Sequence, residues 1–192
     1  MKKIYCTTIL LVLFFLSGIT MAQGLKFGIG GGLTMFSNGN SNANYNTGYH
    51  VGAKLKLEIP LVPITPVGYV NYHVLSSSYS SNGLSASATQ KILSLGVGAE
   101  YSLLPGPISP YIAVDFGYNN FGEEKITTTV GTFPNIPSFS RTGLDIGAGA
   151  QIKIPFLITL DGSIKYNMMN LFGKTSGEQN LSAVIINVSV LF

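Results

Sequence analysis

The chain has 192 residues, of which 46% are apolar and 10% are charged, whereas charged residues make up about a quarter of a typical soluble domain. The apolar content excludes an intrinsically disordered chain, and a formal charge of +3 leaves no basic surplus for binding nucleic-acid phosphates. Low charge together with 23 glycines suits a protein whose outer surface does not face water.

Residues 1–22 have the pattern of a secretory signal peptide. Two lysines follow the first methionine, an apolar stretch is densest over residues 9–16, and small residues lead to a cleavage site after Ala22. A retained N-terminal anchor is the alternative, but the apolar stretch is short for a span of ~20 residues. We therefore predict a mature single domain over residues 23–192, without the chain's one cysteine, Cys6.

The rest of the sequence alternates apolar and small or polar residues with a period of two, which predicts β-strands. Most of the segments have the ~9–11 residues that a tilted strand needs to cross a bilayer. The third segment is the weakest. The eight segments are 25–35, 49–59, 70–74, 93–101, 112–119, 144–153, 158–168 and 184–192.

The connections between these segments alternate between two kinds. Short proline-marked turns occur at 60–66, at 104–107 and around Pro155. The other connections are longer and rich in polar residues, and they are 37–46, 76–89, 122–140 and 173–180. This alternation is typical of an up-and-down barrel whose short turns face the periplasm and whose long loops face outward.

The composition of the two strand faces favours an apolar exterior. The polar face consists mainly of Gly, Ser, Asn and Thr, which are too weakly charged for a water-facing surface. The apolar face carries tyrosines typical of a membrane-interface girdle, namely Tyr49, Tyr72, Tyr101, Tyr118 and Tyr166. A soluble barrel with an apolar interior is the alternative. We predict an all-β fold, a transmembrane antiparallel up-and-down β-barrel of eight strands.

The mature chain resembles the small eight-stranded outer-membrane β-barrels of diderm (Gram-negative) bacteria, the group that includes OmpA-transmembrane-like and OmpX-like proteins. Its most specific feature is the last segment, where alternate apolar residues end on an aromatic one: Val184, Ile186, Val188, Val190 and Phe192. The resemblance implies that these five residues form an assembly signal for the barrel-assembly machinery. It also implies a location in the cell outer membrane, contact with outer-membrane lipid, and no cofactor.

Ten charged residues fall on the predicted lumen face, and their charges balance. They are Lys26, Lys54, Lys56, Lys153 and Lys165 against Glu58, Glu100, Asp115, Asp145 and Asp161. Because unpaired charges in a confined lumen are costly, we expect them to form an ionic network.

Threading the strands from a periplasmic amino terminus places all but Asp145 and Lys165 in the periplasmic half, as an ionic floor that closes the barrel. The outer half is expected to form a polar cup of Gly30, Gly32, His50, Asn71, His73, Asn119 and Asn167. The alternatives are that these residues only fill the lumen, or that they line a gated pore or a ligand cup.

Signals of catalysis or metal binding are weak. Two histidines and no mature cysteine make a metal site unexpected. His73 and Ser76 are spaced to face opposite ways, so they do not suggest the His/Ser/Glu triad of a lipid-modifying barrel enzyme. The glycine run 28–32 opens no helix and therefore lacks the context of a dinucleotide loop.

We therefore predict a non-enzymatic outer-membrane protein with a structural or surface-interaction role through its outer loops. The longest loop, 122–140, contains threonine-rich segments that either extend a hairpin above the membrane or offer a strand edge to an unidentified surface partner. The alternatives are a narrow pore or carrier for small solutes and, with less support, a lipid-modifying enzyme.

Overall fold

The computed structural model describes residues 24–38, 47–81, 84–123, 125–128, 131–132, 137–154 and 158–192. The predicted signal peptide, residues 1–22, lies outside the described residues. Within the described part of the chain, no helix has the length and apolar character to cross a membrane.

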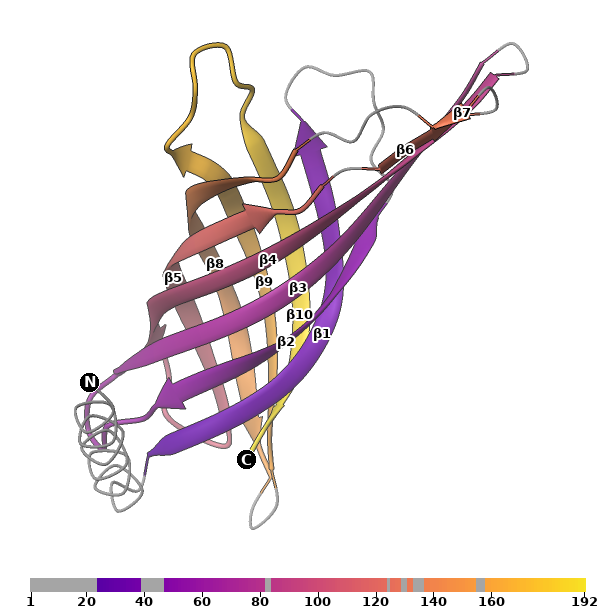
Figure 1. Cartoon of the computed structure of the whole chain (residues 1–192). Helices are drawn as coiled ribbons and strands as arrows, with labels where there is room; N and C mark the ends of the chain where they lie inside the picture. The colour runs from indigo at the N-terminus through magenta and orange to yellow at the C-terminus, as the bar shows by residue number, and fades with distance from the viewer. Residues whose placement is uncertain are drawn as a thin grey trace, which may run out of the picture.

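The described chain forms one antiparallel sheet that closes on itself (Figure 1). Sequence neighbours pair along most of the sheet, and pairing of β1 with β10 joins its first and last strands. Eight strands make the barrel, as predicted, while β6 and β7 continue the sheet beyond the outer end of β4. The strands are β1 (Leu25–Asn38), β2 (Gly48–Leu57), β3 (Ile64–Ser81), β4 (Leu84–Ser102), β5 (Ile108–Phe121), β6 (Lys125–Thr128), β7 (Gly131–Thr132), β8 (Phe139–Lys153), β9 (Thr159–Phe172) and β10 (Leu181–Leu191).

The two ends of the barrel differ. β1 begins and β10 ends at the end that carries the short turns, and we call this the periplasmic end because short turns face the periplasm in outer-membrane barrels. At the opposite, outer end a long hairpin leans away from the barrel (Figure 1).

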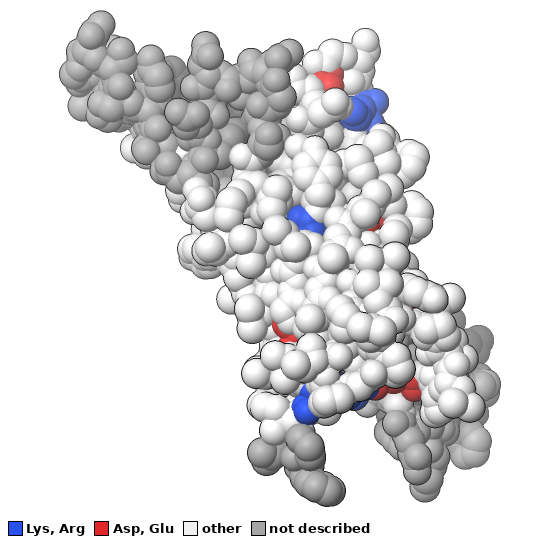
Figure 2. Space-filling view, turned by 180° about the vertical axis from the view of Figure 1, so that it is seen from behind, with Lys and Arg blue, Asp and Glu red and all other residues white. Residues whose placement is uncertain are grey.

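Side chains alternate between the outside of the barrel and its lumen, because successive residues of a strand point to opposite faces. Val97 on β4 is 66% exposed, for example, whereas Lys56 on β2 and Asp115 on β5 are 0% exposed. The prediction that the apolar face points outward is confirmed. Figure 2 shows the wall as mainly white surface, with most charged atoms toward the two ends.

The main difference from the sequence prediction is the outer part of β3 and β4. Residues 76–89 were predicted as a loop, but the two strands stay paired from Ser76↔Thr89 to Ser81↔Leu84. β3 therefore has 18 residues and β4 has 19. Serine and threonine weaken the alternation of hydrophobicity, so the period-two signal fades although backbone pairing continues. The intervening Asn82-Gly83 is the dipeptide that most favours tight hairpin turns.

The predicted loop 122–140 also contains strand structure. β6 pairs with β4 from Ala86↔Thr128 to Thr89↔Lys125, and β7 pairs with β6. The sequence left two roles for the threonine-rich segment, extending a hairpin or offering a strand edge to a partner. Residues 125–128 take the first role, because they extend the sheet of the β3–β4 hairpin.

Candidate functional site

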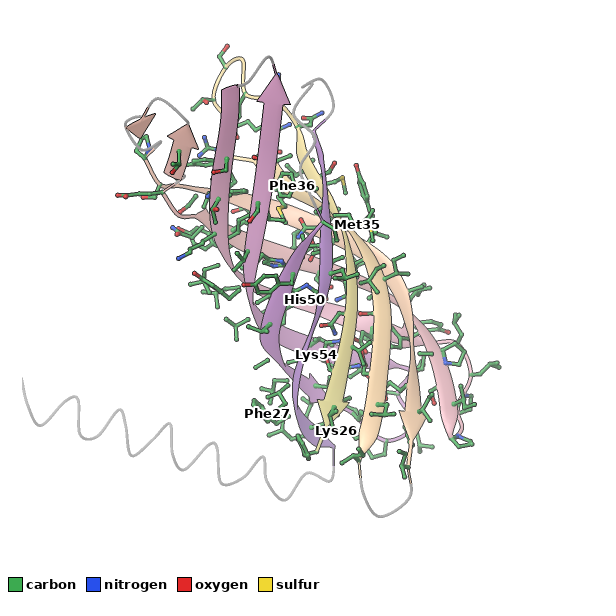
Figure 3. The ribbon with its side chains drawn as sticks, turned by 90° about the vertical axis from the view of Figure 1, so that its right-hand side faces the viewer. Lys26, Phe27, Met35, Phe36, His50 and Lys54 are labelled. Atoms are coloured by element: carbon green, nitrogen blue, oxygen red, sulfur yellow. The ribbon has the colours of Figure 1, made fainter. Side chains whose placement is uncertain are left out.

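The lumen side chains lie in layers along the barrel axis. Figure 3 shows Lys26, Lys54, His50 and Phe36 at successive heights from the periplasmic end toward the outer end. Each layer is built by inward-facing residues of several strands, so residues far apart in the sequence meet there.

The most buried group of charges is the lower ionic layer, which we define as Lys54, Lys56, Glu100 and Asp161. Lys56 Nζ lies 2.6 Å from Glu100 Oε2 and also contacts Asp161 Oδ2. Lys54 Nζ lies 3.1 Å from Asp161 Oδ1 and 3.5 Å from Glu100 Oε1. Two cations and two anions therefore balance, which offsets part of the cost of removing four charges from water.

Tyr111 completes the lower ionic layer, although the sequence prediction did not include it. Its hydroxyl donates to Asp161 Oδ1 at 2.9 Å, and Lys56 Nζ lies 4.8 Å from the centre of its ring. The ring lies against Gly149, where an added Cβ would come within 2.5 Å of it. A glycine on β8 is therefore what leaves room for this tyrosine.

A second charged group surrounds the periplasmic mouth. Lys26 Nζ donates to Glu58 Oε1 at 2.9 Å, and Lys153 Nζ lies 4.0 Å from Glu58 Oε2. In the amide orientation that satisfies both neighbours, Gln151 donates to Glu58 at 3.2 Å and accepts from Lys56 at 2.8 Å. Gln151 thus connects the mouth to the lower ionic layer.

The remaining three charged residues meet in a middle layer. Lys165 Nζ contacts Asp115 Oδ2, and Tyr69 donates from its hydroxyl to Asp145 Oδ2 at 3.0 Å. Asp115 and Asp145 are opposite one another on β5 and β8. Threading places Asp115 in the periplasmic half, and its ion partner is Lys165, a residue that threading leaves out of that half.

The middle layer leaves some polar atoms without partners. The Oδ1 atoms of Asp115 and Asp145 are buried and accept no hydrogen bond from the residues that the structure describes. A cavity of about 30 Å³ adjoins Asp145 and is also lined by Asn71 and Asn187. A cavity of this size has room for about two water molecules.

Two histidines and a threonine form the next layer. His50 and His73 are opposite one another on β2 and β3, and both Nδ1 atoms contact Thr34 Oγ1, at 3.1 and 2.9 Å. Asn187 donates its amide to Ser189, so its oxygen accepts from His50 Nε2 at 3.1 Å.

For neutral imidazoles, these contacts assign the protons of both rings. His50 carries its proton on Nε2 and accepts from the Thr34 hydroxyl, which in turn accepts from His73 Nδ1. Among the described residues, no group of three or more His, Cys, Asp or Glu side chains is placed to hold a metal ion.

The outer part of the lumen is apolar, which corrects the expected polar cup. The inward positions there carry a buried cluster, against which Phe36, Phe139 and Leu181 pack. The cluster consists of Leu75, Ile92, Phe121, Met169, Ala183 and Ile185. The expected cup residues lie below it, where Asn119 accepts from Ser94 at 2.7 Å and donates to the Met169 carbonyl at 2.9 Å.

An ion pair fastens the loop between β9 and β10 to the barrel rim above this cluster. Glu178 accepts from Arg141 Nε at 2.9 and 3.0 Å, from Arg141 Nη2 at 2.6 Å and from Asn170 at 2.9 Å. The backbone and hydroxyl of Thr175 also donate to it, at 3.1 and 3.2 Å. The hydrogen bonds from Arg141 are the main reason that the pKa of Glu178 falls to about 2.

The five residues of the expected assembly signal lie on or directly after β10, at positions that face away from the lumen. Val188 and Phe192 are exposed. The backbone of Phe192 exchanges two hydrogen bonds with Phe27, at 2.8 and 3.2 Å. These residues therefore lie at the seam where the last strand meets the first.

Sequence reasoning missed Tyr69, Tyr111, the apolar cluster and the Arg141–Glu178 pair. Tyr69 has the same strand parity as Asn71 and His73, so parity alone was a usable signal. The glycines Gly96 and Gly149, which face the two tyrosines, were a second signal.

Comparison with known proteins identifies the family of this barrel. Residues 8–192 match the family described as "Outer membrane protein beta-barrel domain". The chain belongs to this family. It is an outer-membrane β-barrel protein, and its location in the outer membrane follows from the family. A comparison with curated protein sequences finds no match.

Solved structures share the fold at low sequence identity. Neisserial surface protein A is 17% identical with a TM-score of 0.62, over 88% of this chain and 96% of that one. Ail, the attachment invasion locus protein of Yersinia pestis, in complex with the heparin analogue sucrose octasulfate, is 16% identical with a TM-score of 0.52, over 88% and 99%. A major outer membrane protein from Thermus thermophilus is 14% identical with a TM-score of 0.54, over 88% and 99%.

Proposed function

We propose that this outer-membrane barrel is non-enzymatic and acts in surface interaction through the sheet that projects from its outer end. The observation that carries the proposal is the length of β3 and β4, which stay paired beyond the barrel and are joined there by β6 and β7. Pairing of β2 with β3 reaches only Tyr49↔Val74. The outer edge of β3, from Leu75 to Ser81, therefore has no strand partner among the described residues.

The chemistry of this projection favours a partner that binds through its backbone. Residues 75–90 contain no charged residue and no proline, the two features that commonly protect an edge strand from pairing. The partner that fits is an extended polypeptide segment that adds a strand to this edge.

A polyanionic ligand, such as the heparin analogue bound by Ail, fits less well. The predicted outer loops hold two lysines, Lys125 and Lys174, against three glutamates, Glu123, Glu124 and Glu178. This balance attracts no polyanion.

The filled lumen and the separation of His73 from Ser76 argue against the two alternatives. The lower ionic layer, the middle layer and the apolar cluster occupy successive levels of the barrel, which disfavours a pore or carrier. His73 is buried in the lumen while Ser76 is exposed on the opposite face of β3, which disfavours a hydrolytic site.

A trimmed variant tests the proposal. Residues 78–87 lie between the paired Ser77 and Ala88 and are replaced by Asn-Gly, which leaves the barrel strands intact. In a strain lacking the native gene, the full chain should restore cell aggregation and adherence to protein-coated surfaces, and the trimmed chain should not. Heat-modifiable migration on a denaturing gel verifies that both are folded. Full restoration by the trimmed chain would overturn the proposal.

A further inference from the structure

Apart from Glu58, which directly follows β2, the connections at the periplasmic end contain no polar side chain. The first, residues 59–63, reads Ile-Pro-Leu-Val-Pro, and the second, residues 103–107, reads Leu-Leu-Pro-Gly-Pro. We call these two turns the periplasmic rim. Residues 154–158, between β8 and β9, have the same composition, Ile-Pro-Phe-Leu-Ile. Turns that face water are normally polar, so this composition requires another explanation.

The rim directs large apolar side chains away from the protein. Leu61 is fully exposed, and Leu104 is 62% exposed. Leu61 also has a φ of 66°, in the left-handed region that leucine rarely adopts. Leu61 therefore has an unfavourable backbone conformation, although its side chain makes little contact with the rest of the chain.

Prolines remove four backbone donors from the rim. Pro60, Pro63, Pro105 and Pro107 have no N–H group. Of the six other rim residues, Val62 donates its N–H to the Ile59 carbonyl at 3.1 Å and Leu103 donates to the Pro110 carbonyl at 2.9 Å. Beside the turns, Ser102 donates to Pro63 at 2.8 Å and Lys153 to Pro107 at 2.7 Å, whereas the N–H groups of Ile59, Leu61, Leu104 and Gly106 have no acceptor among the described residues. Unsatisfied donors are the main reason that loops avoid hydrocarbon, so the four prolines and the two bonded N–H groups lower the cost of moving the rim out of water.

The rim is continuous with the lipid-facing wall. Ile59, Ile64, Tyr101 and Ile108 are exposed directly beside the turns. The charged residues at this end, Lys26, Glu58 and Lys153, pair with one another. Glu58 and Lys153 also line a hollow of about 600 Å³ between the two turns, which forms the mouth of the lumen.

We propose that the periplasmic rim is immersed in the inner leaflet of the outer membrane, with Leu61 and Leu104 among the phospholipid acyl chains and not in periplasmic water. Phospholipid is favoured over a protein partner because the rim offers no polar side chain, whereas a protein interface has about one hydrogen bond per 100–200 Å². This inference does not depend on the role of the outer projection.

The absence of tryptophan from the chain allows a direct test with single-tryptophan variants. Leu61→Trp and Leu104→Trp replace one large apolar side chain by another. Tyr101→Trp gives a reference at the lipid-facing wall, and Lys174→Trp gives a reference in an outer loop. Each variant is folded into phosphatidylethanolamine/phosphatidylglycerol vesicles, with heat-modifiable migration to verify folding.

Two quenchers distinguish the positions. Lipids brominated on their acyl chains should quench tryptophan at 61 and 104 about as strongly as tryptophan at 101. Iodide present on both sides of the bilayer should quench only tryptophan at 174. Strong iodide quenching at 61 and 104 would overturn the proposal by placing the rim in water. Protection from both quenchers would also overturn it, because protein would then cover the rim.

A second measurement avoids the bulk of tryptophan. The predicted mature chain has no cysteine, so Leu61→Cys can be labelled with a charged maleimide that does not enter membranes. With the reagent present on both sides of the bilayer, we expect labelling of Leu61→Cys to be at least tenfold slower than that of Lys174→Cys. Equal labelling rates would contradict immersion of the rim.

Discussion

Single glycines decide whether the lumen tyrosines fit. An added Cβ at Gly96 would lie 2.3 Å from the Tyr69 ring, whereas at Gly68 the nearest atom is 3.9 Å away. Because overpacking a filled interior costs about 1–3 kcal/mol, Gly96→Ala should lower the free energy of unfolding by that amount. Gly68→Ala, the control, should leave it nearly unchanged. Urea unfolding in vesicles, followed by heat-modifiable migration, measures both, and equal stabilities would show that Tyr69 moves aside freely.

The burial of a lysine determines how much its substitution should lower the free energy of unfolding. Lys56→Met leaves Glu100 and Asp161 with one cation fewer in a site shielded from water, and removing one partner of a buried pair costs about 3–5 kcal/mol. Lys26→Met breaks a partly exposed pair with Glu58 and should cost less than about 1 kcal/mol. The same urea assay measures the difference.

A double variant separates charge from packing. Adding Glu100→Gln to Lys56→Met removes one charge of each sign, so the lower ionic layer becomes balanced again, with Lys54 facing Asp161. Part of the lost stability should therefore return. If the double variant is as unstable as the sum of the two single variants, the layer does not act as an ionic unit.

At the level of elements, the barrel strands could be predicted because lipid and lumen impose opposite demands on alternate residues. The signal was strongest where the contrast was greatest, as in residues 49–59. The signal was weakest in β3. There a small residue, Gly68, faces outward and a large aromatic one, Tyr69, faces the lumen, which is the opposite of the expected pattern. Beyond the membrane, alternate residues no longer face lipid and lumen. The serine-rich ends of β3 and β4 therefore lack the alternating pattern, and the sequence predicts a loop there.

The lumen was harder to predict than the strands. Parity shows which residues face inward, but the height of each residue depends on the stagger between neighbouring strands. Parity alone therefore does not show that Asp115 pairs with Lys165, or that inward residues such as Leu75 and Phe121 form one cluster. The Arg141–Glu178 pair joins a strand to a loop, and no periodicity relates the two.

The loop between β9 and β10 should respond to acid through Glu178. A folded-state pKa of about 2 means that the ionised carboxylate stabilises the closed loop. This stabilisation is complete above the ordinary pKa of 4.5 and is lost as the pH falls toward 2. Amide exchange of residues 173–180, corrected for intrinsic rates, should therefore accelerate between pH 4.5 and 2.

Glu178→Gln provides the control for this acid response. The glutamine cannot pair with the Arg141 guanidinium as an anion, so the loop should exchange faster already at pH 7. Its exchange should then show no further acceleration between pH 4.5 and 2. An unchanged pH response in this variant would assign the effect to another group.

At the scale of the whole molecule, the barrel combines two seals of different chemistry. Charged layers fill its periplasmic half and an apolar cluster fills its outer half, with the histidine layer between them. An ion can pass the charged layers only by displacing paired charges. It can pass the apolar cluster only by losing its hydration shell. A barrel closed twice in this way is suited to carrying an outer projection and poorly suited to conduction.

We therefore expect no steady conductance from the purified protein in a planar bilayer. Tyr69→Ala opens space in the middle layer, but Lys56, Glu100 and Tyr111 still close the lumen below it, and the cluster around Phe121 closes it above. Tyr69→Ala should thus remain closed, and so should Phe121→Ala, which loosens only the outer seal. Conductance should appear when Tyr69→Ala, Tyr111→Ala and Phe121→Ala are combined in one variant. A steady large conductance from the unmodified chain would show that the lumen side chains move aside and would favour the pore alternative.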